Sequence, residues 1–314
     1  MYRIGIDLGG TNIAVGVVDE NYQLLAQHSV PTLAQRSAEE VIRDMGDAVE
    51  TVLAKAGITV ADCESIGIGS PGTCDSEKGI VARAYNLGWF DVPICAMLRE
   101  RFGIPVRLSN DANCAALAET VAGAAIGCKN MVLITLGTGV GGGIIIDGRV
   151  VYGAHGAGGE IGHMVLNKEE TVPCGCGKYG CAEQYCSATG IVRTAKRHLN
   201  RSAYPSVLRD IENLTCKDIF DAGAKGDVVA TEILERVYSN LAEFLSDVCC
   251  VVDPEVIVVG GGVSKAGQPL LSGIQRHMHK YLFHAIRGVQ FALATLGNDA
   301  GAYGAFKLIL DDQA

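Results

Sequence analysis

The order of hydrophobic and polar positions predicts a chain that alternates strands with helices. Apolar residues alternate or run together in residues 3–18 around a Gly-Gly-Thr turn, which predicts two strands, and residues 22–30 predict a third. Residues 38–55 predict a helix that begins after Ser37, with an acidic residue three positions later as a capping box, and ends at Gly57. Its apolar positions fall on one face: Val41, Met45, Val49, Val52 and Leu53.

Two segments of the chain follow the same design. IDLGGTNIAVGVVDE, from Ile6, and ITLGTGVGGGIIIDG, from Ile134, each contain an apolar strand, a Gly/Thr turn, a second apolar strand and an Asp-containing turn. The repeat predicts two similar halves that each open with a β-hairpin, and two unrelated hairpins are the alternative. We expect an N-terminal α/β domain over residues 1–118, completed by a C-terminal helix over 298–314, and a C-terminal α/β domain over 119–297.

Composition indicates an ordinary globular protein. The chain has 314 residues, of which 48% are hydrophobic and 19% charged, and its net charge of −9 disfavours a nucleic-acid partner. It opens as MYRIGIDLGG, without a signal peptide, and no apolar run is long enough to span a membrane. We therefore expect a cytoplasmic protein with reduced thiols, in which five of the 12 cysteines are small core residues: Cys63, Cys95, Cys114, Cys249 and Cys250.

Three glycine-rich turns each follow an apolar strand: Gly9-Gly10-Thr11, Gly137-Thr138-Gly139 and Gly260-Gly261-Gly262. Glycine lets backbone N–H groups approach an anion without a Cβ in the way. A hairpin needs glycine in any case, but three such turns, two of them in the repeated hairpins, favour phosphate binding, with Thr11 and Thr138 as hydroxyl donors. Asp7 precedes the first turn, and a carboxylate there repels phosphate unless a cation bridges them, so Asp7 is a candidate to hold Mg²⁺.

Three cysteines lie within eight residues, in the pattern C-x-C-x4-C: Cys174, Cys176 and Cys181. A disulfide is disfavoured because the compartment is reducing and the Cys174–Cys176 loop is too short for relaxed geometry. Three closely spaced thiols are typical of a zinc site that lacks one ligand. Cys186 and His163 are both candidates for the fourth.

Asp111 stands where a predicted strand meets a predicted helix, in LSNDANCAALAE. The positive end of the helix dipole favours its anion. It is either a helix cap, for which Asp is a favoured residue, or a catalytic carboxylate.

These motifs together resemble a known family. DLGGTN (Asp7–Asn12), LGTGVGGG from Leu136 and GGG at Gly260 resemble the phosphate 1, phosphate 2 and adenosine motifs of the sugar kinase/Hsp70/actin fold. With GGEIGH and CGCGKYGCAE, the chain resembles the ROK family (repressors, open reading frames, kinases) from Arg3 to the last helix. The resemblance implies two similar actin-like (ribonuclease H-like) α/β domains flanking a cleft, with a zinc-binding loop in the second. It also implies ATP-dependent phosphorylation of a hexose.

The resemblance also implies roles for single residues. Asp111 would be the general base that takes the proton of a sugar hydroxyl, and Asn110 beside it would hydrogen-bond the sugar. His163 is selected as the fourth ligand of a closed, structural Cys3His zinc site. Further sugar contacts are implied for Glu160, His163 and Glu183, and Gly72 would lie in the loop that closes under the sugar.

The implied substrate is glucose. NLGWFDVPI, which begins at Asn86, and SATGIVR, from Ser187, are similar to the glucokinase branch, in which Asn86 would reach a sugar hydroxyl. An N-acetylglucosamine or N-acetylmannosamine kinase is the alternative. A sugar-sensing ROK repressor is more distant, because the first strand starts close to Met1 and the chain offers no basic recognition helix. The family is commonly dimeric, which implies a homodimer or higher homo-oligomer. The helix over 229–248 is a candidate interface, although we favour core burial.

Overall fold

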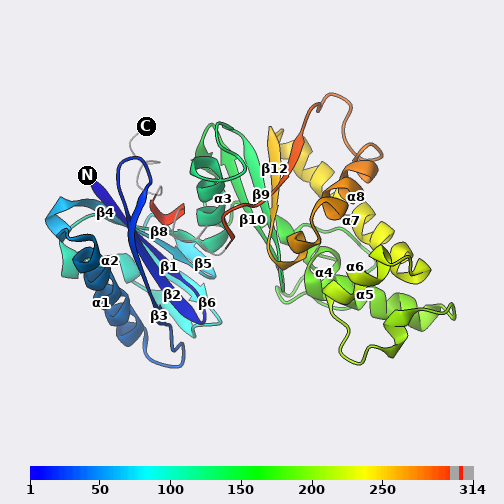
Figure 1. Ribbon diagram of the computed structural model, residues 1–314, viewed down its shortest axis with the longest axis horizontal. Helices are drawn as coiled ribbons and strands as arrows, with labels where there is room; N and C mark the ends of the chain where they lie inside the picture. Colours follow the sequence, from blue (N-terminus) through cyan, green and yellow to red (C-terminus); the bar gives the residue numbers. More distant parts are fainter. Residues whose placement is uncertain (298–303, 307–314) are drawn as a thin grey trace. The chain divides into compact units, whose positions relative to one another are not determined.

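The chain contains two five-stranded sheets and forms two compact units (Figure 1). The computed structural model describes residues 1–297 and 304–306. Unit 1 contains Met1–Lys129, Gly143–Gly158 and the described residues from Thr295 onward, and unit 2 contains Asn130–Gly142 and Gly159–Ala294. The first stretch of unit 1 thus runs past residue 118, where we expected the division. Within the predicted helix over 298–314, the structure describes only residues 304–306, and these are helical. The rest of that prediction lies outside the described residues.

The first sheet has the strand order β3-β2-β1-β4-β8. Its strands are β1 (Tyr2–Leu8), β2 (Asn12–Val18), β3 (Leu24–Pro31), β4 (Cys63–Ser70) and β8 (Val106–Asn110). β1 pairs antiparallel with β2 and parallel with β4, which in turn pairs parallel with β8. The register pairs Asp7 with Gly69 and Ser70 with Asn110, so the polar residues that end β1 and β8 are at the same edge of this sheet.

Helices cover the first sheet as the apolar pattern predicted. α1 (Ala38–Ala56) contacts β2 and β3, and in Figure 1 it lies alongside them with α2 (Ile94–Phe102) next to it. The predicted capping box at Ser37 is confirmed, and so is the end at Gly57, which has a φ of 71° that favours glycine. α3 (Asp111–Val121) follows β8 directly, and a small sheet joins β5 (Thr73–Asp75), β6 (Ile80–Ala84) and β7 (Trp89–Val92).

The second sheet repeats the design of the first. Its order is β11-β10-β9-β12-β13, with the strands β9 (Met131–Leu136), β10 (Val140–Ile146), β11 (Arg149–Val150), β12 (Val256–Gly260) and β13 (Gln290–Leu293). β12 pairs parallel with β9 on one side and with β13 on the other, as β4 does with β1 and β8. The repeat of Ile6 and Ile134 is therefore a repeat of topology, and unrelated hairpins are excluded.

The helices of unit 2 follow one another along the chain: α4 (Glu183–Cys186), α5 (Ala188–Arg201), α6 (Cys216–Ala224), α7 (Val228–Val252) and α8 (Gln268–Met278). The apolar residues at helical spacing along α7 are buried, which confirms its core role: Val229, Ile233, Val237, Leu241, Leu245 and Val248. One expectation was wrong, because Cys250 is exposed while Cys249 is buried. Adjacent helical positions point about 100° apart, so both cannot face the core. Within the described part of the chain, no helix is long and apolar enough to span a membrane.

Candidate active site and zinc loop

The first glycine turn joins β1 to β2 and is held by its own backbone. The N–H of Gly9 donates to the carbonyl of Asn12 at 2.9 Å, and a Cβ on Gly9 would meet that same oxygen at 2.8 Å. A Cβ on Gly10 would lie 2.9 Å from Nδ2 of Asn86, which brings Asn86 against this turn. Thr11 is exposed at the tip of the turn. Both glycines are therefore needed for close approach, as phosphate-binding turns require.

Asn110 and Asp111 occupy successive positions at the start of α3. Asn110 is the N-cap of α3, because its Oδ1 accepts the N–H of Asn113 at 2.8 Å, and Asp111 is the first helical residue. The alternative of Asp111 as the helix cap is thus excluded. Its Oδ1 accepts the N–H of Ala112 at 2.8 Å, and its side chain is exposed. Asp111 is therefore accessible to a substrate and stabilised as an anion by the helix start.

Asp7 and Asp111 are close enough to interact electrostatically. Burial of Asp7 raises its pKa to about 6, and the negative charge of Asp111 adds to the rise. A divalent cation between two such carboxylates would relieve their repulsion, and carboxylate oxygens are ligands that Mg²⁺ accepts. These residues fit the predicted role of Asp7 in holding Mg²⁺.

Gly72 lies in a tight turn between β4 and β5. Its φ is 86°, and a Cβ there would meet the carbonyl oxygen of Arg83 at 2.1 Å, so a side chain at this position is excluded by sterics as well as by backbone geometry. The turn packs against the hairpin that carries Asn86 between β6 and β7. The predicted sugar residues Gly72 and Asn86 thus lie in unit 1, the same unit that contains Asp7.

The second glycine turn joins β9 to β10 and contacts Glu183. The N–H of Val140 donates to Oε2 of Glu183 at 3.0 Å, and a Cβ on Gly139 would meet the same oxygen at 2.3 Å. Thr138 is exposed, and its carbonyl accepts the hydroxyl of Thr189 at 2.7 Å. The predicted phosphate turn Gly137–Gly139 and the predicted sugar ligand Glu183 are therefore in direct contact.

The third turn follows β12. Gly261 has a φ of 80°, and a Cβ there would lie 2.6–2.7 Å from backbone atoms of Leu136, at the end of β9. Gly262 begins the short 3-10 helix Gly262–Ala266. Unit 2 therefore carries two of the three predicted nucleotide turns, and Gly261 fixes Gly260 and Gly262 against the strand that leads to the Gly137 turn.

The predicted zinc ligands form a cluster. The ligand atoms of His163, Cys174, Cys176 and Cys181 all lie within 4.8 Å of one another. The sulfurs of Cys176 and Cys181 are 3.7 Å apart, and a tetrahedral zinc with bonds of about 2.3 Å would hold two sulfurs about 3.8 Å apart. Cys186 is outside this group and fully buried, and burial raises its thiol pKa, so it is not the fourth ligand. The residues fit a closed, tetrahedral zinc site.

The ring of His163 faces two ways. Its Nδ1 is 3.9 Å from the sulfur of Cys174, on the side of the thiol cluster, and its Nε2 is 4.0 Å from Oε2 of Glu160. Oε1 of Glu183 accepts the thiol of Cys174 at 3.3 Å. The predicted sugar residues Glu160, His163 and Glu183 are thus gathered around the zinc loop of unit 2, while Asp7, Asn110 and Asp111 are gathered in unit 1.

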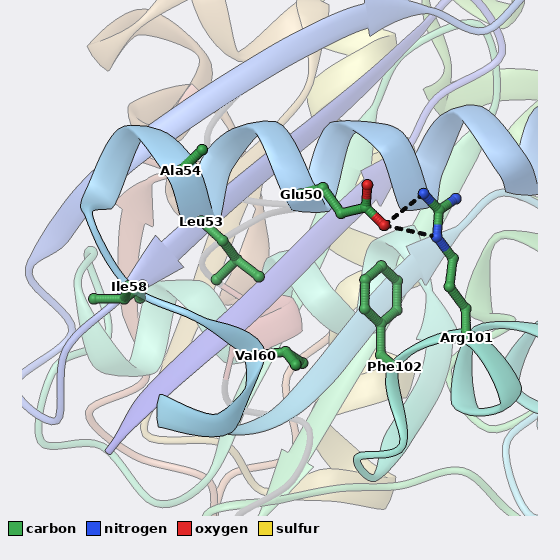
Figure 2. A pocket seen from close by; sticks show the side chains of 7 residues that line it. All are labelled: Glu50, Leu53, Ala54, Ile58, Val60, Arg101 and Phe102. Carbon is green, nitrogen blue, oxygen red and sulfur yellow. Dashed lines mark hydrogen bonds and ion pairs between the residues drawn. The ribbon is translucent and has the colours of Figure 1, made fainter.

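A hollow in unit 1 lies apart from these residues. Figure 2 shows Leu53, Ile58, Val60 and Phe102 around it, with the ion pair of Glu50 and Arg101 at one side. Its volume is about 360 Å³, and its lining includes none of the predicted site residues. We assign it no role in the chemistry.

Sequence reasoning missed a polar network around the buried Glu170, beside the zinc loop. Its members are Glu170, Gln184, Tyr185, Arg193 and Arg197. Its signal in the sequence is faint. Arg193 and Arg197 are one helical turn apart on α5, and Glu170 is one of two adjacent acids in a loop. Only the fold shows that they meet.

Comparison with known proteins decides the family. The sequence matches the family model described as ROK family over residues 3–312. The chain belongs to the ROK family. It is 38% identical to a glucokinase of Halalkalibacterium halodurans, over 96% of this chain and 93% of that protein.

Solved structures of ROK proteins share the fold. A ROK hexokinase from Thermus thermophilus superposes with a TM-score of 0.86 at 34% identity, over 100% of this chain and 99% of the other. A ROK family glucokinase from Streptomyces griseus, in complex with glucose and AMPPNP, gives a TM-score of 0.75 at 34% identity, with 100% of each chain covered. The ROK fold predicted from the glycine turns and the zinc motif is confirmed.

Proposed function

We propose that this ROK protein is a glucokinase that transfers the γ-phosphoryl group of ATP to the 6-hydroxyl of glucose. The observation that carries the proposal is the pairing of Asp111, exposed at the start of α3, with Asp7 beside the first glycine turn. In this proposal Asp111 would accept the proton, while Asp7 and the first glycine turn would hold the cation and phosphate, which is what phosphoryl transfer to a hydroxyl requires. The glucokinase relatives support glucose as the acceptor.

Asp111 acts as the general base in this proposal. The 6-hydroxyl oxygen of glucose bonds to the γ-phosphorus, the bond from that phosphorus to the bridging oxygen of ADP breaks, and the hydroxyl proton passes to the Asp111 carboxylate. A positioned base of this kind contributes about 10²–10⁴-fold to the rate. The helix start that stabilises the Asp111 anion also fixes its direction.

The nucleotide contacts come from the glycine turns. The N–H groups of Gly9 and Gly137 close their own turns, at 2.9 and 3.0 Å. The other residues of the turns at Gly9–Asn12 in unit 1, and at Gly137–Gly139 and Gly260–Gly262 in unit 2, would offer backbone N–H groups and hydroxyls to the phosphates and adenosine. Mg²⁺ bound with ATP would neutralise phosphate charge, and Asp7 would hold it directly or through water.

The sugar contacts of the proposal follow the family resemblance. They are Gly72, Asn86 and Asn110 in unit 1, and Glu160, His163 and Glu183 in unit 2. Since Oδ1 of Asn110 is used in the helix cap, its Nδ2 is the atom that can donate to a sugar hydroxyl. Zinc on His163 and the three cysteines would be structural, because four protein ligands leave no open position.

The test is a coupled ADP-release assay with glucose, mannose, fructose, N-acetylglucosamine and N-acetylmannosamine. Glucose should have the highest kcat/KM. An N-acetyl group at the 2-position would leave a carboxylate of the sugar site without its hydroxyl donor, which costs about 1–3 kcal/mol, or roughly 5- to 150-fold in kcat/KM. The proposal fails if either N-acetylhexosamine equals or exceeds glucose at saturating Mg-ATP.

Two further expectations belong to the same proposal. A glycolytic kinase acts where ATP and free hexose are available, so we propose a cytoplasmic location. We also propose a homodimer or higher homo-oligomer, by resemblance to the family, and light scattering on the purified protein would test it.

A further inference from the structure

Glu170 is a buried carboxylate surrounded by donors. Its side chain is 2% exposed. Arg197 binds it through two parallel hydrogen bonds of 2.8 and 3.0 Å, Arg193 donates at 3.1 Å, and the hydroxyl of Tyr185 donates at 2.7 Å. Arg197 is the main reason that the pKa of Glu170 lies well below its usual range, against the opposing effect of burial. The group is therefore an anion at any pH at which the protein is assayed.

The same carboxylate holds the chain that leads into the zinc loop. Its Oε1 accepts the N–H groups of Thr171 and Val172, at 3.1 and 3.0 Å. Val172 is two residues before the zinc ligand Cys174. Glu170 therefore fixes the entry of the loop to α5, which carries both arginines.

Gln184 holds the exit of the loop. Its Oε1 accepts the N–H groups of Gly180 and Cys181, at 2.8 and 3.2 Å, and its Nε2 donates to the carbonyl of Val172 at 2.9 Å. Arg193, which binds Glu170, also donates to the carbonyl of Gln184 at 2.9 Å. Entry and exit of the loop are thus joined in one network, and Glu183 precedes Gln184 directly.

We propose that Glu170 is a positioning residue for both ligand sets: with Arg193 and Arg197 it holds the zinc-binding cysteines and Glu183 in their working geometry. The inference rests on the proposed function, because it assigns Glu183 to glucose and the cysteines to zinc. Glu170 touches neither ligand and acts through the backbone of the loop and through α4.

The network should affect glucose and zinc binding more than the chemical step. Asp7 and Asp111 belong to unit 1, and none of the network residues does. Loss of the buried anion leaves two guanidinium groups facing an amide that also donates, so the loop entry must shift. A shift of Glu183 would weaken its hydrogen bond to the sugar, and loss of a group that supports metal ligands typically costs 10–100-fold in metal affinity.

The test uses variants of the full-length protein. Glu170→Gln removes the charge with little change in shape, Arg197→Lys removes the paired hydrogen bonds but keeps the charge, and Tyr185→Phe removes one donor. Glu235→Gln is the matched control. Glu235 lies in α7 of unit 2 and, like Glu170, binds an arginine and a second side chain, which are Arg276 and His277 of α8. Each variant is measured for KM and kcat with glucose, for zinc affinity by competition with a chromophoric chelator, and for Tm.

We expect Glu170→Gln to raise the KM for glucose and to weaken zinc binding by about tenfold or more, while kcat at saturating glucose stays within about threefold. Arg197→Lys should raise the KM for glucose and weaken zinc binding to a smaller degree, again with little change in kcat. Tyr185→Phe should have the smallest effect on both binding constants. Glu235→Gln should lower Tm alone. If Glu170→Gln does not fold, the graded effect of Arg197→Lys and Tyr185→Phe decides the question.

The inference is overturned if these variants lower Tm but leave the KM for glucose and the zinc affinity as in the wild type, because Glu170 would then only stabilise the fold. It is also overturned if kcat falls as much as kcat/KM. A wild-type protein that phosphorylates no glucose would instead contradict the proposed function, and the zinc-affinity arm would still test Glu170.

Discussion

The contact between Gly139 and Glu183 allows a sharp test of the sugar site. The φ of Gly139 lies outside the left-handed region, so its backbone conformation accepts alanine. The Cβ of that alanine would, however, lie 2.3 Å from Oε2 of Glu183. Ordinary contact begins at 3.4 Å, and the carboxylate oxygen must therefore move by roughly 1 Å. That movement breaks its hydrogen bond to the N–H of Val140, which is 3.0 Å long.

The size of the effect follows from the hydrogen bond that the displaced Glu183 carboxylate would no longer make to a sugar hydroxyl. A hydrogen bond to a charged acceptor contributes about 1.5–3 kcal/mol, which corresponds to roughly 10- to 150-fold in an equilibrium constant. If Glu183 binds the sugar from its present place, Gly139→Ala should weaken glucose binding by an amount in that range. Calorimetric titration with glucose in the absence of nucleotide measures this directly, without interference from any change in ATP binding.

Gly137→Ala is the matched control for this variant. Gly137 is in the same turn, and a Cβ there meets no atom within 4 Å. The Kd of the Gly137→Ala variant for glucose should stay within about twofold of the wild-type value. The reasoning is refuted if Gly139→Ala binds glucose as tightly as Gly137→Ala does, since Glu183 would then either not contact glucose or not depend on this turn.

Three further predictions follow from other parts of the structure. Asp111→Asn should lower kcat by at least about 100-fold and leave the Kd for glucose within about tenfold; a variant that keeps a tenth of the rate would remove Asp111 as the base. Purified protein should contain one zinc per chain by elemental analysis, and Cys181→Ser should lose it; full zinc in the variant would exclude Cys181 as a ligand. Asp227→Ala removes the N-cap of α7 and should cost about 1 kcal/mol of stability. Burial alone would raise the pKa of Asp227, but the N–H groups of Ala230 and Val207 hold that pKa below its usual range. The Tm difference from the wild type should therefore be constant near neutral pH and shrink as the pH falls below about 4, the ordinary pKa of an aspartate. A difference that grows on acidification would contradict this.

Much of the fold could be predicted from local patterns. The capping box at Ser37, the end of α1 at Gly57 and the apolar face of α7 are encoded within a few neighbouring residues, and all three are found. The sequence repeat predicted two similar halves that each open with a hairpin, and the two five-stranded sheets have corresponding strand orders. Three of the candidate zinc ligands could be read from the C-x-C-x4-C spacing, whereas the choice of His163 over Cys186 came from the resemblance to the ROK family. The cluster of four ligand atoms fits that choice.

Contacts between distant segments could not be predicted in this way. Glu170 and Arg197 look like surface charges in the sequence, and only the packing of the loop on α5 brings them together and buries Glu170. The contact of Gly139 with Glu183 likewise joins a hairpin turn to a helix start that is far along the chain. Cys250 was predicted to lie in the core but is exposed, because an apolar neighbourhood in the sequence does not show which side of a helix faces the core.

The most direct test of the account is the identity of the phosphorylated product. Purified protein, Mg-ATP and glucose should give ADP and a phosphate ester on carbon 6 of glucose in equal amounts by ³¹P NMR, and Asp111→Asn should give almost none. Release of inorganic phosphate in place of the ester, an ester at another carbon, or undiminished transfer by Asp111→Asn would contradict the assignment of Asp111 as the base of a glucokinase.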